Sequence, residues 1–240
     1  MNTRLFLLFL LFTKCTDGLT QKLQTEDVFK RYLVSHDQSV AKTVINSKDG
    51  LYSLFCQGDL TDDPAKKINL FTEFIRQNPK YGMGEAYLNR GIANSMSEKY
   101  DSAVADCSEA ISINKKEPYA YYFRGESYLS LTKYDKAIDD FNESIKLNPS
   151  FVLAYHMRGI CFLSQKNSRN ALSDFNRVIE LDKNYDQAYL LRGVVYDEMG
   201  EFKKAVADWN SAKKINKKDT KEADELIEKA NKKMREKKTE

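Results

Sequence analysis

The sequence contains few of the residues that build catalytic and metal-binding sites. It has two histidines and four cysteines in 240 residues. His36 and His156 lie in different segments, and no cysteines or histidines have the spacing of a zinc site. Glycine-rich phosphate loops are absent, and no serine, histidine and acid can be argued to converge. We therefore predict a protein that is not an enzyme and that binds no metal and no cofactor.

An excess of charge of one sign is missing as well. Charged residues make up 30% of the chain, yet the net charge is only +3. It falls to +1 when residues 1–14 are removed, because they contain two basic residues, Arg4 and Lys14, and no acid. A nucleic-acid-binding protein needs a basic face. We therefore expect no nucleic-acid partner.

Long hydrophobic runs are also lacking. The run Leu5–Phe12 has eight residues, which is too short to span a hydrocarbon layer of about 30 Å. Arg4 precedes it and polar residues follow, so residues 1–18 have the layout of a signal peptide. The alternative is an apolar N-terminal helix that docks on the fold.

Cys15 lies just after this run, and two outcomes of processing stay open. Residues 12–15 resemble a bacterial lipobox in layout only, because Lys14 stands where a small residue is expected. One outcome is lipidation of Cys15, which would be the chain's only link to a membrane, and the other is ordinary cleavage near Gly18. We expect an exported protein, periplasmic or a membrane-anchored lipoprotein; without a signal it would be cytoplasmic.

The sequence does contain a repeat of 34 residues. Four copies follow one another without insertion, at 84–117, 118–151, 152–185 and 186–219. An aromatic residue, an Arg-Gly pair, an alanine and a late aspartate recur in each copy. They are Tyr87, Arg90-Gly91, Ala103 and Asp106; Tyr121, Arg124-Gly125, Ala137 and Asp140; Tyr155, Arg158-Gly159, Ala171 and Asp174; and Tyr189, Arg192-Gly193, Ala205 and Asp208. Such self-similarity indicates stacked copies of one structural unit.

Each copy holds two helical patterns. In 118–151 they run roughly over Ala120–Leu131 and Tyr134–Leu147. The second pattern has apolar residues at helical spacing, namely Tyr134, Ala137, Ile138, Phe141 and Ile145. Asn148-Pro149 ends it, because proline cannot continue a helix and restricts the residue before it. The recurrent glycine predicts a close approach of the two helices.

This pattern resembles the tetratricopeptide repeat. The matching signature positions are Tyr121, Gly125, Tyr128, Ala137, Phe141 and Pro149. The arginine column with the late aspartate resembles a common bacterial variety of this repeat and, with the signal, favours a bacterial envelope type. The resemblance implies an all-α fold, a right-handed α-solenoid of helix-turn-helix repeats.

The ends of the chain carry weaker patterns. Residues 19–83 form a predicted helical N-terminal region, with amphipathic helices near Leu23–Leu33 and Val40–Ile45 and a third at Ala65–Gln77. Roughly Leu51–Met83 is a degenerate repeat, as expected at a solenoid end. Residues 220–240 are a predicted capping helix and basic tail. The apolar stripe of this helix consists of Ala223, Leu226, Ile227, Ala230 and Met234.

The recurrent charges admit two interpretations. The four arginines could form a basic ladder for an acidic ligand, or each could pair with the aspartate 16 residues later in its own copy. A buried charge must be paired, so we favour a structural Arg–Asp ladder. Cys107 and Cys161 lie at core positions, and Cys56 lies in the degenerate region. We expect buried thiols.

The resemblance also implies a partner-binding groove, because the first helices of such repeats line a concave face. Its main residues here would be Leu88, Ile92, Tyr119, Tyr122, Glu126, Leu153, His156 and Leu190. Family members that grip a C-terminal carboxylate use lysine and asparagine at positions that Leu88, Ile92, Tyr122 and Leu153 occupy here. We therefore expect an apolar protein or peptide segment as partner, with Tyr119 and Tyr122 as anchors.

The predicted function is that of a non-catalytic protein–protein interaction scaffold of the cell envelope. Two alternatives remain at this stage. Residues 19–64 could fold back and fill the groove, and a chain without a signal would be a cytoplasmic adaptor or co-chaperone. The oligomeric state does not follow from the sequence.

Overall fold

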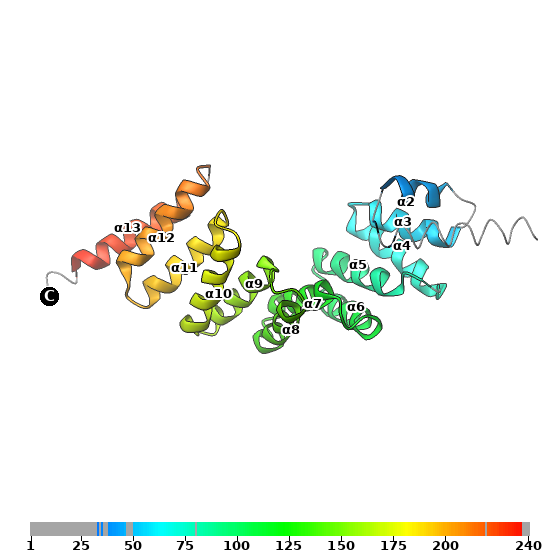
Figure 1. Cartoon of the computed structure of the whole chain (residues 1–240), viewed down its shortest axis with the longest axis horizontal. Coiled ribbons are helices and arrows are strands. Elements are labelled where there is room, and N and C mark those ends of the chain that lie inside the picture. Colours follow the sequence, from blue (N-terminus) through cyan, green and yellow to red (C-terminus); the bar gives the residue numbers. More distant parts are fainter. Residues whose placement is uncertain are drawn as a thin grey trace, which may run out of the picture. The chain divides into compact units, whose positions relative to one another are not determined.

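The structure is a computed structural model that describes residues 33, 35, 38–46, 50–79, 81–218 and 220–236. Within these ranges the chain forms helices joined by short turns and contains no strand (Figure 1). The predicted all-α solenoid is confirmed. The predicted signal at 1–18, Cys15 and the helix near Leu23–Leu33 lie outside the described residues or almost entirely so. The helices fall into two compact units, divided between Lys115 and Lys116.

Among the described residues, unit 1 contains five helices, each packed on the next. They are α2 (Gln38–Ile45), α3 (Gly50–Leu60), α4 (Pro64–Arg76), α5 (Met83–Met96) and α6 (Tyr100–Ile113). Asp63 caps α4, because its carboxylate accepts hydrogen bonds from the first backbone N–H groups of the helix. Phe55 lies edge-on to Phe71 and Phe74, with ring centroids 5.3 and 5.2 Å apart. These rings form the core beneath α3 and α4.

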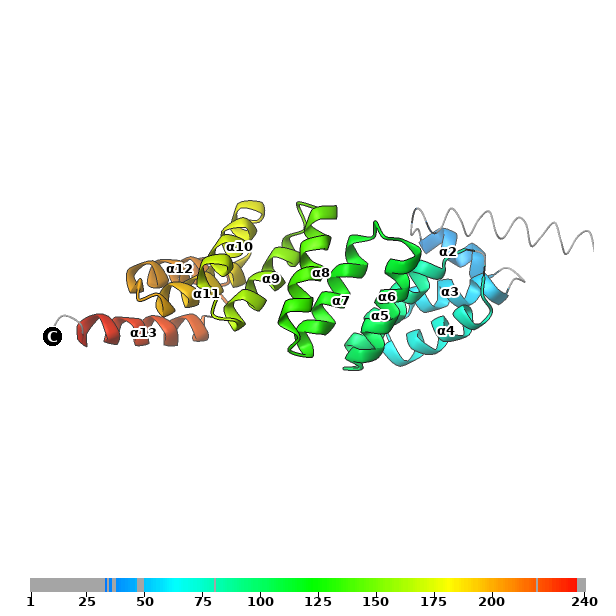
Figure 2. The same cartoon turned by 90° about the horizontal axis from the view of Figure 1, so that it is seen from below.

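The described part of unit 2 contains three pairs of helices and a final helix (Figures 1 and 2). They are α7 (Pro118–Ser130), α8 (Tyr134–Leu147), α9 (Val152–Ser164), α10 (Ser168–Leu181), α11 (Asp186–Glu198), α12 (Phe202–Ile215) and α13 (Lys221–Glu236). Each first helix packs on its own second helix, and α9 and α11 also pack on the second helix of the copy before. The helix α13 packs on α12 as a further first helix would.

The joint between the two helices of a copy has the same backbone conformation throughout. One residue in each joint is left-handed, with φ of 59° at Glu98, 58° at Thr132, 59° at Lys166 and 76° at Gly200. This conformation ends a helix and reverses the chain. Only the last copy uses glycine, which adopts it without steric cost.

The recurrent glycines lie where the paired helices approach most closely. A Cβ at Gly159 would stand 2.8 Å from the Phe175 ring, and one at Gly193 would stand 2.4 Å from Trp209. The predicted close approach is therefore confirmed. In the degenerate pair α3–α4 the same kind of contact recurs, because a Cβ at Gly58 would lie 3.1 Å from Phe71.

The structure confirms the Arg–Asp ladder. In all four copies the arginine Nε donates to one carboxylate oxygen at 2.7–2.9 Å and Nη2 donates to the other at 2.6–2.7 Å. The aspartate side chains are 4–9% exposed. Each of these arginines is therefore paired with an aspartate of its own repeat, and the alternative of a basic ladder for an acidic ligand does not hold.

These arginines also contact the preceding pair of helices and the recurrent tyrosine of their own copy. Nη1 of Arg158 donates to Asn142 and that of Arg192 to Asn176, both at 2.6 Å, and Nη1 of Arg90 donates to Thr72 at 3.1 Å. Each acceptor lies on the second helix of the preceding pair. The recurrent tyrosine lies under its own arginine, at 5.4–5.8 Å from the ring centroid.

The described cysteines Cys56, Cys107 and Cys161 are buried free thiols, as expected. Burial raises the pKa of Cys56 and of Cys161 to about 12, so these thiols stay protonated and unreactive at neutral pH. None of the helices that the structure describes combines the length and the hydrophobicity that crossing a membrane requires.

Candidate functional site

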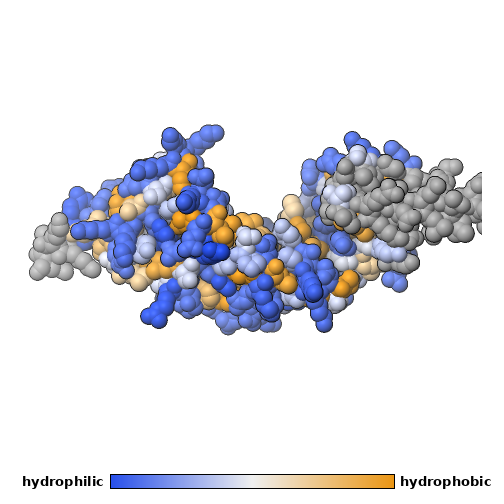
Figure 3. Space-filling model, viewed as in Figure 1, coloured by the Kyte–Doolittle hydropathy of each residue, from blue (hydrophilic) through white to orange (hydrophobic). Residues whose placement is uncertain are grey.

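The predicted groove residues lie on the first helices of the repeats, and the two units are considered separately. In unit 1, Leu88 and Ile92 are half-buried on α5. In unit 2 the remaining six residues lie on α7, α9 and α11. We call these six the first-helix face: Tyr119, Tyr122, Glu126, Leu153, His156 and Leu190. Over unit 2, Figure 3 shows hydrophobic residues in orange between hydrophilic residues in blue.

Tyr119 and Leu153 are the exposed apolar members of the first-helix face. Their exposed fractions are 48% and 40%, and they occupy equivalent positions in successive copies. The Tyr119 ring lies edge-on to Phe151, with centroids 5.0 Å apart, and Phe151 immediately precedes α9. Of the two exposed side chains, Tyr119 thus rests on a buried ring.

Tyr122, His156 and Leu190 occupy one equivalent position in three copies, and all three are buried, with exposed fractions of 4%, 6% and 7%. The Tyr122 ring packs on Phe151 and Phe123 at 5.0 Å and on Phe141 at 5.9 Å. In this structure Tyr122 supports the face from beneath and is not accessible as an anchor. The reason is that Phe151, the last residue of the same copy, packs on its ring.

A polar cluster interrupts this apolar packing. We call Tyr122, Glu126, His156 and Tyr185 the Glu126 cluster. The Tyr122 hydroxyl donates to Glu126 Oε1 at 3.4 Å. Glu126 is half-buried, and burial raises the pKa of its carboxyl. The His156 ring lies 5.0 Å from the Tyr185 ring, and the electrostatic influence of Tyr185 helps to raise the pKa of Tyr122, after burial and Glu126.

His156 contributes an unusual atom to the Glu126 cluster. Its Nδ1 is buried and has no hydrogen-bond partner. Burial lowers the pKa of the imidazole to about 4, so the ring is neutral at pH 7. An orphaned buried nitrogen carries a free-energy cost. The sequence identified His156 but not Tyr185, the last residue of the same copy, whose contact with the imidazole ring only the packing reveals.

The described residues offer no site for metal chemistry. Within the ranges that the structure covers, no group of three or more His, Cys, Asp or Glu residues is placed to hold a metal ion. The first-helix face presents apolar contact area and a few hydrogen-bonding groups.

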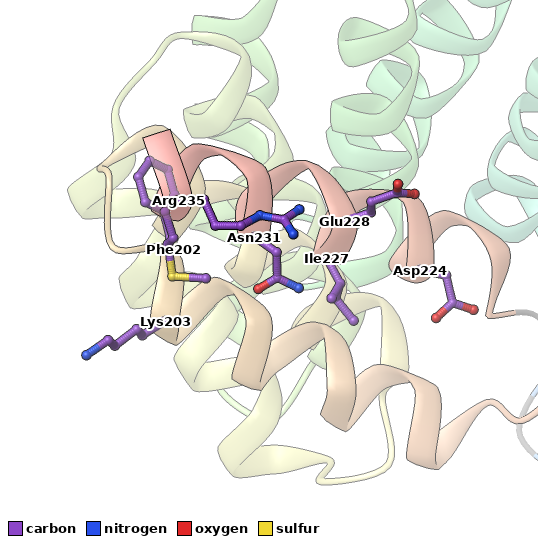
Figure 4. A pocket seen from close by; sticks show the side chains of 8 residues that line it. Phe202, Lys203, Asp224, Ile227, Glu228, Asn231 and Arg235 are labelled. Carbon is purple, nitrogen blue, oxygen red and sulfur yellow. The ribbon is translucent and has the colours of Figure 1, made fainter. Parts of the chain in front are cut away.

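A separate pocket lies at the end of unit 2, between α12 and α13 (Figure 4). Its volume is about 630 Å³. Phe202 and Lys203 line it from α12, and Ile227, Glu228 and Arg235 are among its residues on α13. Charged side chains of both signs surround a largely apolar floor, to which Phe202, Ile227 and Met234 belong.

Comparison with known protein families identifies the repeated part of the chain. Two family models described as tetratricopeptide repeat match it, one over residues 118–151 and the other over 152–185 and 186–219. No curated protein matches the chain. The matched ranges fall within unit 2.

Solved structures resemble the fold at low sequence identity. A crystal structure of MamA is 20% identical, covers 65% of this chain and 90% of its own chain, and has a TM-score of 0.61. MamA from Desulfovibrio magneticus RS-1 is 16% identical over 65% of this chain and 87% of its own, with a TM-score of 0.61. TTC0263, a tetratricopeptide-repeat protein of Thermus thermophilus, is 15% identical over 69% and 89%, with a TM-score of 0.56. These likenesses establish the fold.

Proposed function

Because this chain is a tetratricopeptide-repeat protein, with repeats over residues 118–219, we propose that it holds a segment of another protein on the first-helix face of unit 2. The repeats make it a protein–protein interaction scaffold. The finer proposal is that the bound segment is largely apolar and lies in the predicted concave groove.

The exposure of Tyr119 and Leu153 carries this proposal. Large apolar side chains that stay 48% and 40% exposed lose contact with water when a partner covers them, and this is favourable. The Tyr119 ring packs on Phe151, which in turn packs on Tyr122. A rigid aromatic anchor costs little conformational entropy on binding.

Site-specific crosslinking tests the location of the partner. A photoreactive benzoylphenylalanine would replace Tyr119 or Leu153 in the full chain, in cells that make the protein. The matched control is the same replacement at Met199, which is also 48% exposed but follows the end of α11. We expect a protein adduct from positions 119 and 153 and none from 199. Equal adducts at all three positions, or none at 119 and 153, would contradict the proposal.

We further propose that the scaffold is exported and works in the cell envelope. The support is the sequence alone: Arg4, the run Leu5–Phe12 and the polar residues after it. Mass spectrometry of the mature N-terminus tests this, with Cys15→Ser as the variant that separates lipidation from ordinary cleavage near Gly18. An intact Met1 in the mature protein would overturn export and favour a cytoplasmic adaptor.

A further inference from the structure

We propose that the partner segment on the first-helix face carries an arginine or lysine whose side chain pairs with the Glu126 carboxylate. This inference rests on the proposed function and names the chemistry of the partner. It starts from one carboxyl group to which the described part of the chain brings no counter-ion.

Glu126 differs from the other carboxylates that the repeats withdraw from water. The four ladder aspartates each accept two hydrogen bonds from an arginine. Glu126 is half-buried on α7. Among the described residues it accepts one long hydrogen bond, from the Tyr122 hydroxyl at 3.4 Å. It forms no ion pair there. A carboxylate that loses water without gaining a cation raises the free energy of the folded chain.

Its neighbours in the cluster do not supply the missing charge. His156 lies on the next first helix but is neutral at pH 7, because burial lowers its pKa to about 4. Tyr122 and Tyr185 are neutral as well, since burial raises the pKa of both hydroxyls. The Glu126 cluster thus holds one carboxyl group among three neutral rings. That combination is complementary to a cation with an aliphatic stem.

The same unit contains an internal example of this recognition. Asp197, on the first helix α11, accepts a hydrogen bond from Lys233 Nζ of α13 at 2.6 Å. There a following helix of the chain brings a basic residue to a first-helix carboxylate. At Glu126 no such residue arrives from the described chain, and the position is left for a partner.

The spacing along α7 defines the motif that the partner should carry. Tyr119 and Glu126 are seven residues apart on one face of the helix, which is about 10 Å at the α-helical rise. An extended strand covers that distance in about three residues. An extended partner would therefore carry an apolar residue and a basic residue three positions apart. A helical partner lying along α7 would carry them about seven positions apart.

Selection from a peptide library tests the inference on the full chain. Random 12-residue peptides would be displayed and selected on the wild type, on Glu126→Gln and on Asp139→Asn. The last variant is the matched control, because it removes one negative charge from α8, outside the first-helix face. We expect wild type and Asp139→Asn to enrich peptides with an apolar and a basic residue at the predicted spacing. Glu126→Gln should keep the apolar preference and lose the basic one.

Binding constants then measure the pair directly. A selected peptide and its Arg→Gln form would be compared by fluorescence anisotropy. On wild type the arginine form should bind about tenfold tighter or more, as is typical of a hydrogen bond to a charged group, and on Glu126→Gln the difference should vanish. A basic preference that survives in Glu126→Gln overturns the inference. Selection of apolar peptides without a basic residue overturns it while the proposed function stands, and selection of nothing overturns both.

Discussion

The interior of the repeats and the first-helix face are built from the same helices but follow different rules. In the interior, the Arg–Asp pair, the glycine and the tyrosine are the same in every copy and make the same contacts. On the face, one equivalent position holds Tyr122, His156 and Leu190 in turn. The repeated contacts fix the geometry of the stack, and the varied positions are left to determine what it binds.

This difference predicts the largest loss of stability for the ladder. Arg158→Met would leave the Asp174 carboxylate, 4% exposed, without its cation, and Asn142 without its donor. Removing one partner of a buried pair costs about 3–5 kcal/mol. We expect a loss of that size in the free energy of unfolding, measured with urea.

Two further variants sharpen this result. Arg158→Met combined with Asp174→Leu should recover much of the loss, because two apolar residues can replace a buried ion pair at little cost. Arg76→Met removes the exposed ion pair with Glu73 and should change stability little. If Arg158→Met were as mild as Arg76→Met, the ladder would have no structural role.

The second prediction concerns the helix contact. A Cβ at Gly193 would stand 2.4 Å from Trp209, whose indole N–H donates to the Leu190 carbonyl at 3.0 Å. Gly193→Ala should therefore force the two helices apart and cost roughly 2–3 kcal/mol of unfolding free energy. Gly50→Ala is the control, because nothing lies within 4 Å of a Cβ there; it should be neutral or slightly stabilising. Equal effects at the two glycines would contradict the close approach.

A smaller effect of opposite sign is expected on the face. His156→Leu places at this position the residue that the next copy has in Leu190, and it removes the orphaned Nδ1. At pH 7 it should stabilise the chain by about 1–2 kcal/mol. A loss of stability at pH 7 would show that the imidazole makes a needed contact.

The same variant should change the pH dependence of stability. The pKa of His156 is lowered from 6.5 to about 4 in the folded chain, so between these values the unfolded chain binds the additional proton. Wild-type stability is therefore lost as the pH falls from about 6.5 toward 4. At pH 5 this contributes about 2 kcal/mol, which His156→Leu should not lose. Urea unfolding of both chains at pH 7 and pH 5 measures this, and an equal loss in wild type and His156→Leu would contradict it.

The smallest effect on stability is expected where the effect on binding is greatest. Tyr119 and Leu153 are 48% and 40% exposed, so Tyr119→Ser with Leu153→Ser should change unfolding free energy by less than about 1 kcal/mol. The double variant should nevertheless lose the peptides that wild type selects. Met199→Ser, at similar exposure, should keep them. If the double variant still bound these peptides, Tyr119 and Leu153 would not be part of the binding site.

Much of the fold could be predicted because the same helical periodicity and the same recurrent residues occur in every copy of the repeat. Helical periodicity in 118–151 predicted both helices, and the structure places α7 at Pro118–Ser130 and α8 at Tyr134–Leu147. The Arg–Asp pairing followed from a constant separation of 16 residues and from the cost of burying an unpaired charge. The contacts of each arginine with the preceding copy, at Asn142 and Asn176, were not foreseen, because the sequence does not show which helices of successive copies meet.

The candidate site was less predictable. Its residues were named from position in the repeat, and this could not separate exposed Tyr119 from buried Tyr122, three residues later. The burial of Tyr122 depends on Phe151, which lies beyond the second helix at the end of the same copy. Tyr185 was missed for the same reason: it stands just before α11, at the end of the copy that contains His156, and only the folded chain brings the two rings together. The helical periodicity of the sequence predicts neither contact.

The sequence by itself determined the repeat, its helix pairs, the glycine contact and the paired charges, because each depends on residues within one copy and on periodicity that recurs in the next. Tertiary structure alone decided which first-helix side chains stay open to a partner and which are covered. It also left Glu126 without a cation from the described chain while Asp197 received Lys233. These outcomes depend on how side chains from different helices and turns pack together in three dimensions, which the periodicity of the sequence does not specify.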